Sequence, residues 1–488
     1  MTQEILVNVT TAEVRVALLE NGILQEVHIE RSLSQGLLGN IYKGRITRLL
    51  PGIQATFVDI GLDRSAFLHI SDMGLIPHSS STVDMIYPDI REVLIPGQEI
   101  LVQVYKNPIG SKGARLSTQF TIPSRYLVLT PGFSHVAVSQ KITDEAERER
   151  LLSMLSPSDL GGYIFRTVAE GVTQAEVNTD KELLNMIWTQ VDKHIKEVKP
   201  PNVVYEEIPI ILRVLRDLAG FDIKKIQVDH YESAMQMKSY AEKYIPSLCN
   251  NIEFYAENKP IFDLYAVEDE LKKALQPKIF LQSGGHVVFD QTEAMTTIDI
   301  NTGSYVGQDS LEHTVFKTNL ESIDIIARQI RLRNLGGIII IDFIDMLDPQ
   351  HKEQLIEALK IALSKDSSKT QVSELSSLGL VQMTRKRTRE SLEHILCTPC
   401  PLCQKRGSIK SAKTICYEIL RELKRISHYY PWQGFVVVAS PAVINELQNE
   451  EATLLAGLEI QLNKLITLRA ESVYGQERYD VFPLSEKE

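Results

Sequence analysis

The clearest hydrophobic pattern in the chain lies between residues 293 and 348. Two apolar runs, TTI and IIII, each end in an aspartate, Asp299 and Asp342. Runs of this kind are typical of strands that are covered on both faces. Between them, apolar residues recur at steps of three and four, which predicts one face of a helix; they are Ile323, Ile326, Ala327 and Ile330. Gly336 and Gly337 are expected to end that helix, so the pattern predicts a strand–helix–strand unit with a carboxylate after each strand.

Two carboxylates at strand ends are a common way to hold a hard cation. A magnesium ion takes one or two carboxylates and completes its shell with water and phosphate oxygens. Asn301 stands two residues after Asp299, so in an extended chain its amide points the same way and can orient that carboxylate. The alternative is that both aspartates cap turns or helices. Asp345 is expected on the other side of the strand, and Asp348 as a turn or cap residue.

The rest of the chain shows shorter elements. Residues 1–35 alternate between apolar and polar positions around an Asn-Gly pair, which predicts a β-hairpin. Residues 40–117 contain five short strands separated by glycine and proline, which predicts a small barrel; the polar segment 78–89 inside it reads as an inserted loop. Residues 121–205 mix strands with helices. Residues 206–275 are mainly helical, with one strand in IKKIQVD and a helix start at Glu268-Asp269-Glu270, where negative charge is favourable.

Composition narrows the class of protein. The chain has 488 residues, of which 43% are hydrophobic and 24% charged, as in ordinary globular proteins, and its length suggests about three domains. No apolar run approaches the roughly eighteen residues of a membrane helix, and the N-terminus lacks the pattern of a signal peptide. We therefore expect a cytoplasmic protein without a membrane span.

The net charge of −11 is unusual for a protein that binds nucleic acid, because a basic surface is the usual footprint. Basic residues nevertheless cluster near the two aspartates, which favours contacts to phosphate; the alternative is a solvated helix face. The residues concerned are Arg328, Arg331, Arg333, Arg385, Lys386, Arg387 and Arg389.

Three of the five cysteines fall within seven residues, Cys397, Cys400 and Cys403. This spacing fits a reducing compartment and a metal better than a disulfide framework. Two thiolates separated by two residues are half of a tetrahedral zinc site. Cys397 with a distant residue, or a second protomer, could supply the remaining ligands; alternatively, these are three ordinary reduced cysteines in a loop.

The motifs TTIDINTG, GGIIIIDFIDM, TRKRTRE and CTPCPLC together resemble the ribonuclease E/G family. The resemblance extends from NIYKGRITRLLPGIQATFVDIG to the C-terminus, and the end of the chain soon after the cysteines indicates the shorter, G-type members. It implies that Asp299 and Asp342 bind a magnesium ion that activates water for phosphodiester hydrolysis, with Asn301 as the supporting amide.

The resemblance also implies a multidomain α+β and α/β fold. Its parts would be residues 1–35 and 206–275 for a ribonuclease-H-like subdomain, 36–120 for an inserted OB-fold RNA-binding barrel, 121–205 for a 5′-monophosphate sensor region, 276–396 for a DNase-I-like catalytic domain, 397–407 for a zinc link and 408–488 for a small α+β oligomerisation domain.

Further binding residues follow only from the resemblance. Phe57 and Phe67 would stack on bases and Lys112 would meet phosphate, although a lone Phe in such a barrel is more often core. Arg166 and Thr167 would bind the 5′ monophosphate. A further arginine of the family corresponds to Lys369 in this chain, and a lysine cannot form bidentate hydrogen bonds to phosphate.

The resemblance implies that Cys400 and Cys403 from each of two chains share a zinc ion, and it leaves the role of Cys397 open. The expected protein is a magnesium-dependent endoribonuclease that cleaves single-stranded RNA and is stimulated by a 5′-monophosphate end. It would act in maturation of ribosomal RNA 5′ ends, transfer-RNA processing and messenger-RNA decay, as a zinc-linked homodimer or homotetramer. The alternatives are a non-catalytic RNA-binding or assembly factor and a zinc-linked scaffold, and the presence of both aspartates and the amide favours the enzyme.

Overall fold

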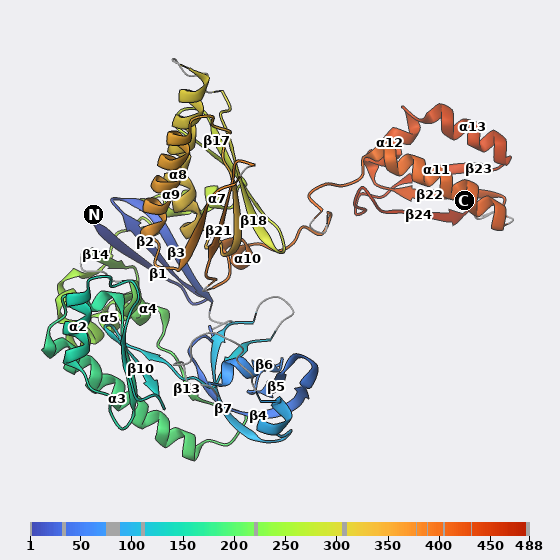
Figure 1. The fold of residues 1–488 in the computed structure, drawn as a ribbon. Helices are drawn as coiled ribbons and strands as arrows, with labels where there is room; N and C mark the ends of the chain where they lie inside the picture. The colour runs from blue at the N-terminus through green and yellow to red at the C-terminus, as the bar shows by residue number, and fades with distance from the viewer. Residues whose placement is uncertain are drawn as a thin grey trace. The chain divides into compact units, whose positions relative to one another are not determined.

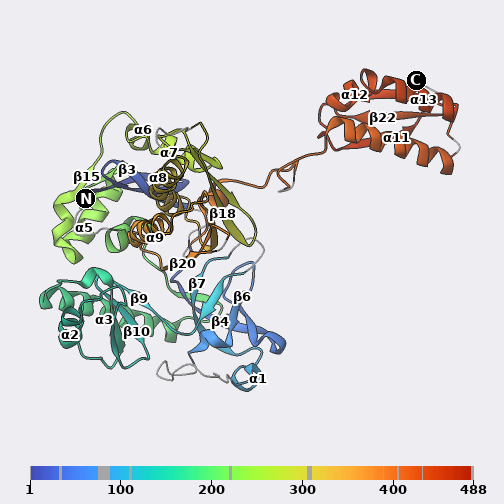
Figure 2. The same cartoon turned by 45° about the horizontal axis from the view of Figure 1, so that its top comes forward.

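The computed structural model describes residues 2–31, 36–74, 88–108, 113–218, 223–304, 310–376, 378–387, 389–403, 406–430 and 432–484. These residues form two compact units, Met1–Ile395 and Leu396–Glu488. Both units mix helices and strands (Figures 1 and 2). None of the described helices is long and apolar enough to cross a membrane.

A five-stranded sheet joins the N-terminal hairpin to a segment beyond residue 222, in the order β15-β14-β1-β2-β3. Asn21 and Gly22 have φ of 51° and 78°, the left-handed values that a tight two-residue hairpin requires, so the predicted hairpin is confirmed. The elements are β1 (Gln3–Val9), β2 (Glu13–Glu20), β3 (Ile23–Arg31), α4 (Ile210–Arg213), β14 (Ile223–Val228), α5 (Tyr231–Tyr244), β15 (Ile252–Phe254), α6 (Ile261–Leu264) and α7 (Val267–Ala274).

A closed barrel of five strands follows, as the glycine- and proline-separated runs predicted. β4 pairs with both β5 and β7 and so closes the barrel, and β13 adds to the outside of β4. This architecture is consistent with an OB-fold. Most of the predicted inserted loop 78–89 lies outside the described residues. The elements are β4 (Ile41–Leu50), β5 (Ala55–Asp59), β6 (Ala66–His69), α1 (Ile90–Val93), β7 (Glu99–Lys106), β8 (Arg115–Ser117) and β13 (Asn202–Tyr205).

A four-stranded sheet, ordered β11-β12-β10-β9, packs beside a long helix that begins with a capping box at Thr173 and Glu176. Its core includes Leu184 and Val191 of that helix. The elements are β9 (Ile122–Pro123), β10 (Leu127–Pro131), β11 (Val136–Val138), α2 (Glu145–Met154), β12 (Gly161–Phe165) and α3 (Gln174–Glu197).

A six-stranded sheet, ordered β16-β17-β18-β19-β21-β20, contains the predicted strand–helix–strand unit. Helices α8 and α9 lie side by side and share one hydrophobic core with this sheet (Figures 1 and 2). The elements are β16 (Lys278–Phe280), β17 (His286–Gln291), β18 (Met295–Asn301), α8 (Leu311–Leu332), β19 (Gly337–Asp342), α9 (Pro349–Ser364), β20 (Thr370–Leu375), β21 (Leu380–Arg385) and α10 (Leu392–Leu396).

The connection from α8 to β19 differs in detail from the prediction. The helix ends at Leu332, before the two glycines, and Asn334 takes the left-handed conformation (φ 48°) that reverses the chain. Gly337, with φ 92°, instead opens β19.

The unit Leu396–Glu488, orange to red in Figure 1, is a small α+β domain with the strand order β23-β22-β24. Its helix α11 packs five buried side chains against the sheet and α12. The elements are α11 (Ala412–Tyr429), β22 (Gly434–Ala439), α12 (Pro441–Gln448), α13 (Ala452–Leu462), β23 (Leu465–Ala470) and β24 (Tyr479–Pro483).

Candidate active site

Asp299 and Asp342 end two neighbouring parallel strands. β18 and β19 pair in a register that places Asp299 directly opposite Asp342. The neighbouring residues Ile298 and Ile341 point into the core, so alternation directs both carboxylates to the other face of the sheet, where both residues are exposed. The two aspartates that the sequence singled out are therefore brought together on one surface.

The amide of Asn301 supports this pair, because its Nδ2 donates a hydrogen bond of 2.7 Å to Oδ2 of Asp299. Burial, followed by the nearby carboxylates of Asp299 and Asp345, raises the pKa of Asp342. Neither Asp299 nor Asp342 caps a helix; that role belongs to Asp348, whose carboxylate accepts from the backbone N–H of Gln350 at the start of α9.

Asp345 lies close to the pair, contrary to the expectation that it would face the other side of the strand. β19 ends at Asp342, so strand alternation no longer applies three residues later. Gly379, at φ 77°, lets the carboxylate approach, because a Cβ at this position would stand 2.7 Å from Oδ1 of Asp345.

Helix α8 holds the loop that follows Asp342. Asn319 bonds both backbone groups of Ile344, with its Nδ2 donating to the carbonyl at 2.8 Å and its Oδ1 accepting from the N–H at 3.1 Å. Glu312 accepts from the backbone N–H groups of Leu347 and Asp348, and these bonds lower the pKa of Glu312. The loop beside the acid pair is thus fixed by two side chains of a helix that is itself anchored in the core.

The face that carries the acid pair is open within the described unit. Ile338 is 48% exposed although it belongs to the apolar run, whereas Ile339 and Ile341 are fully buried against α8 and α9. The prediction that both faces of this strand would be covered is therefore wrong. An apolar, open face beside two carboxylates is suited to contact a large substrate.

The donor set of this pair fits a hard divalent cation. Asp299 and Asp342 offer carboxylate oxygens, which are the ligands that magnesium prefers. A cation would also relieve the repulsion that, after burial, contributes to the raised pKa of Asp342. Across the described residues, no three His, Cys, Asp or Glu side chains converge on a metal position. Water and substrate oxygens would complete the coordination shell of an ion held by the two carboxylates, as is usual for magnesium.

Phe57 and Phe67 stand opposite each other on β5 and β6, with ring centres 6.1 Å apart in an edge-to-face arrangement. Both are half-buried, whereas their neighbours Val58 and Leu68 form the barrel core. The rings therefore lie on the outer side of the barrel. Lys112 lies outside the described residues.

Two arginines extend this aromatic pair into a row across four strands. Arg48 pairs with Phe57 and Arg115 pairs with Phe67. Arg115 also lies 5.4 Å from the ring centre of Tyr105 and bonds to Asp72. Cations that flank exposed rings are suited to a strand of nucleic acid, since rings stack on bases and guanidinium groups meet phosphates.

Arg166 follows β12 and is held from two sides. Its Nη1 donates to the carbonyl of Ser124 at 2.7 Å, and its Nη2 pairs with Oδ1 of Asp217 at 2.9 Å. Asp217 is also paired with the buried Arg216, and these two arginines lower the pKa of Asp217 against the opposing effect of burial. Arg166 is thus positioned by a carboxylate that is itself fixed.

Lys141 links the segment of Thr167 to that of Lys369. The hydroxyls of Thr167 and Ser139 lie 3.0 Å apart. Two residues after Ser139, the Nζ of Lys141 donates to the carbonyl of Ser367 at 2.7 Å, close in sequence to the exposed Lys369. The three residues predicted to bind a 5′ phosphate therefore lie on segments that touch, although no direct contact joins Lys369 to Arg166 in the described structure.

Comparison with known proteins identifies the family of the chain. Residues 121–388 match the model of the ribonuclease E/G family. Ribonuclease G of Escherichia coli K12 is 50% identical over 99% of both chains, and that of Haemophilus influenzae is 47% identical over 98% of this chain and 99% of its own. Ribonuclease E of H. influenzae is 32% identical over 100% of this chain and 52% of its own. The chain belongs to the ribonuclease E/G family.

In this ribonuclease E/G family chain, Cys400 and Cys403 lie at the start of the unit Leu396–Glu488. Backbone N–H groups of Cys403 and Leu402, together with the thiol of Cys403, bond to the sulfur of Cys400 and lower its pKa, which favours the thiolate that binds metals. Cys397 is exposed and does not complete a three-ligand group with the pair in the described residues. The two thiols fit half of a zinc site.

The prediction that the arginines near the acid pair contact phosphate is wrong for the three that are buried, Arg331, Arg333 and Arg385. Arg331 pairs with Glu20 and Glu26, and Arg385 pairs with Asp366. The others also have protein partners: Arg328 pairs with Glu270, Arg333 donates to the carbonyl of Gln276, and Arg389 donates to the carbonyl of Val27. Arg331 is buried where α8 packs against β3, and a buried cation requires partners. Lys386 and Arg387 remain exposed, although Arg387 also donates to the carbonyl of Gly336.

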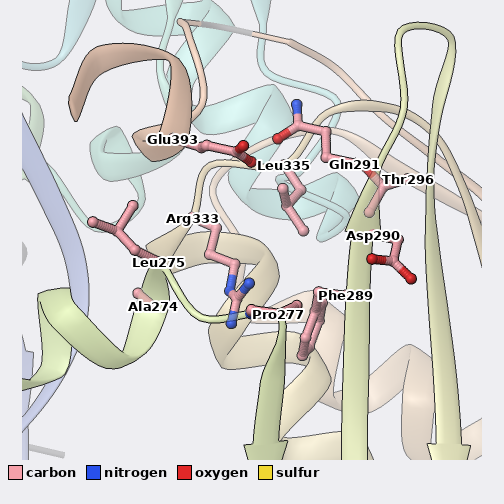
Figure 3. A pocket seen from close by; sticks show the side chains of 10 residues that line it. All are labelled: Ala274, Leu275, Pro277, Phe289, Asp290, Gln291, Thr296, Arg333, Leu335 and Glu393. Carbon is pink, nitrogen blue, oxygen red and sulfur yellow. The ribbon is translucent and has the colours of Figure 1, made fainter. Parts of the chain in front are cut away.

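A pocket of about 280 Å³ lies where β17 turns into β18, at the other end of the strands from the acid pair. Figure 3 shows Arg333 directed toward Pro277 and Phe289. Its guanidinium lies 4.5 Å from the centre of the Phe289 ring, and burial lowers its pKa to about 10. The remaining lining residues are Ala274, Leu275, Asp290, Gln291, Thr296, Leu335 and Glu393. None of these is among the predicted site residues.

Several residues that the structure places at these sites were not predicted from the sequence. His286 stands directly opposite Asn301, Asp217 fixes Arg166, and Asn319 holds the loop after Asp342. Each is well separated in sequence from its partner, and no local motif marks it. Only the pairing of strands and the packing of helices identify them.

Proposed function

We propose that this endoribonuclease of the ribonuclease E/G family hydrolyses single-stranded RNA with the help of a magnesium ion held by Asp299 and Asp342. The observation that carries the proposal is the register of β18 and β19, which sets the two carboxylates opposite each other on an open face. When bound, magnesium would supply a Lewis acid that activates water and neutralises charge on the phosphate.

The residues of the chain would prepare this site. Asn301 orients the carboxylate of Asp299 through its 2.7 Å hydrogen bond, which keeps one oxygen engaged and directs the other outward. Asn319 and Glu312 fix the loop after Asp342, so that the second carboxylate keeps its position. This preorganisation matters because small displacements of a reacting group cost much of the rate.

The barrel would hold the RNA strand. The exposed side of Phe57 and Phe67, flanked by Arg48 and Arg115, offers stacking surfaces for bases and charge for phosphates. Lys112 is proposed as a further phosphate contact on the basis of the family resemblance.

Stimulation by a 5′ monophosphate is proposed to depend on Arg166 and Thr167, with a smaller contribution from Lys369. The guanidinium of Arg166, positioned by Asp217, can give charge-assisted bonds to a phosphate, and the hydroxyl of Thr167 can add a donor. Weaker binding of a 5′-triphosphate or hydroxyl end is part of the same proposal and rests on the family resemblance.

The domain layout given by the resemblance remains part of the proposal, with ribonuclease-H-like, OB-fold, sensor and DNase-I-like parts within Met1–Ile395. We further propose that Cys400 and Cys403 share a zinc ion with the same pair of a second chain, giving a homodimer that can assemble into a tetramer. Substrates are proposed to be precursors of ribosomal and transfer RNA and messenger RNA.

One experiment tests the central proposal. A single unstructured oligonucleotide is prepared with 5′-monophosphate, 5′-triphosphate and 5′-hydroxyl ends and incubated with the protein, with and without magnesium. Cleavage that requires magnesium and is fastest for the monophosphate is expected. Binding without cleavage under all conditions would instead support a non-catalytic RNA-binding factor.

A further inference from the structure

The open face of the six-stranded sheet continues past the acid pair to the edge strand β16. Register places Lys278 opposite Val288, which is opposite Asp299, and places Phe280 opposite His286, which is opposite Asn301. Directly paired residues point to the same side of a sheet. Lys278 and Phe280 therefore share the face of the acid pair and its supporting amide.

Phe280 is 69% exposed, although it is a large apolar side chain. The Nζ of Lys278 lies 5.2 Å from the centre of its ring, and the ring of His286 lies 6.3 Å away on the inner side. One side of the Phe280 ring is thus supported by protein, and much of its surface is left to solvent. A single exposed aromatic residue is common on protein surfaces and needs no explanation. Phe280 is different because it shares the face of the acid pair and has the cation of Lys278 beside it.

We propose that Phe280 and Lys278 form a subsite that stacks one unpaired base of the RNA and contacts its phosphate. The inference rests on the proposed function, because it concerns the substrate of the same face. A base can stack on an aromatic ring whatever its identity, and a nearby lysine meets the backbone as a point charge.

The position of the subsite suits a nucleotide close to the cleaved bond. β16 and β18 are two strands apart, and therefore about 10 Å apart. An RNA strand that places a phosphate at Asp299 and Asp342 would pass over β17 to reach Phe280. The cation beside the ring favours an anionic strand over an apolar protein surface as the occupant.

The test compares Phe280→Ala with Phe280→Tyr, which keeps the ring. Affinity for a fluorescent single-stranded oligonucleotide is measured by anisotropy, and KM and kcat are measured separately. Phe280→Ala is expected to weaken affinity and raise KM roughly ten-fold, as for the loss of one stacked base, with kcat unchanged; Phe280→Tyr should restore both. Lys278→Gln should lower the slope of log affinity against log salt by about 0.7, the value for one contact to a single strand.

A scan with single abasic positions locates the base. Removal of the base at one position should weaken binding to the wild type. The same removal should have no further effect in Phe280→Ala, because the ring that stacks on that base is already absent. Phe254→Ala, which removes a 40% exposed ring from strand β15, is the matched control and should behave as wild type.

Unchanged affinity in Phe280→Ala would overturn the subsite, as would an abasic effect that is equal in both proteins. A changed sedimentation coefficient with unchanged affinity would assign Phe280 to a contact with a second copy instead. Because binding is measured without cleavage, absence of cleavage by the wild type would count against the proposed function and not against this subsite.

Discussion

Asp299 and Asp342 lie directly opposite each other at the ends of the parallel strands β18 and β19. Their carboxylates leave the sheet on the side that α8 and α9 do not cover, and the negative charge of Asp299 contributes to the raised pKa of Asp342. Two carboxylates so placed repel each other unless a cation lies between them, which makes their removal the most direct test of the site.

The first prediction concerns these carboxylates. Asp299→Asn or Asp342→Asn should reduce cleavage at least about a hundred-fold, because one of two magnesium ligands is lost, while RNA binding through the barrel persists. Single-turnover cleavage and filter binding are measured on the same preparations. Asp290→Asn, an exposed change on the adjacent strand β17, is the control and should cleave normally. Near-normal cleavage rates in Asp299→Asn or Asp342→Asn would contradict the assignment of these residues as magnesium ligands.

The second prediction concerns the barrel. Phe57→Ala should weaken RNA binding by about 1–3 kcal/mol, the usual worth of a base–aromatic stack. The ring is half-buried and packs edge-to-face on Phe67, so its loss should cost less stability than the roughly 3–5 kcal/mol of a Phe→Ala change in a core. Thermal melts and binding isotherms separate the effects. A lower melting temperature with unchanged affinity would show that Phe57 is a structural residue.

The third prediction concerns the 5′ end. Arg166→Ala should abolish the preference for a 5′ monophosphate over a 5′ hydroxyl and leave cleavage of a circular RNA unchanged, because a circle has no end to bind. Asp217→Asn should weaken the same preference less strongly, since Arg166 keeps its bond to Ser124 but loses a charged partner. The ratio of cleavage rates for the two ends is the readout. A preserved ratio in Arg166→Ala would exclude this residue as the anchor.

The fourth prediction concerns assembly. Cys400→Ser or Cys403→Ser should lose both zinc and the dimer, because four thiolates from two chains would complete the tetrahedral set and metal binding would then drive association. The expected stoichiometry is one zinc per two chains. Cys397→Ser is the matched control and should change neither. Metal analysis with analytical ultracentrifugation measures both quantities; one tightly bound zinc on a monomeric chain would contradict a shared site.

The fifth prediction concerns stability in acid. Burial, followed by the positive charge of Arg389, lowers the pKa of His28 to about 4 from an ordinary value of 6.5. In the window between these values the unfolded chain binds the proton more readily than the folded one, so stability falls as the pH falls from 6.5 toward 4. The full contribution is about 3 kcal/mol.

His28→Gln should flatten this part of the pH profile, because the titrating group is removed while an acceptor for Arg389 remains. Urea unfolding of both proteins at pH 7 and pH 5 measures the difference. The exposed His428→Gln is the control and should retain the wild-type slope. Equal slopes in the wild type and His28→Gln would show that His28 does not contribute.

Much of the local structure follows from the sequence. The Asn21–Gly22 pair predicted a hairpin because few other residues tolerate two successive left-handed conformations. The spacing of Ile323, Ile326 and Ile330 predicted the buried face of α8, and all three lie in its core. These features depend on residues close in the chain, so periodicity and turn chemistry suffice to identify them.

The candidate site was only partly accessible from sequence. Asp299 and Asp342 stand out because each ends an apolar run, and Asn301 because it lies two residues from Asp299. That the two strands are neighbours and in register could not be read from either run. Asn319, Asp217 and His286 carried no local signal, since the residues they lie beside are near them in space but not in sequence.

The sequence by itself determined the strand–helix–strand unit, the turn of the N-terminal hairpin and the residue types available for chemistry, because these depend on short-range periodicity and on backbone preferences. Only the tertiary structure decided which face of a strand stays open, as the exposed side chain of Ile338 shows. It also decided which charged side chains form ion pairs within the protein, as Arg331 does with Glu20 and Glu26. The physical reason is that exposure and ion pairing are set by whatever packs against a residue. For this chain those neighbours come from segments hundreds of positions away, such as Glu26 beside Arg331.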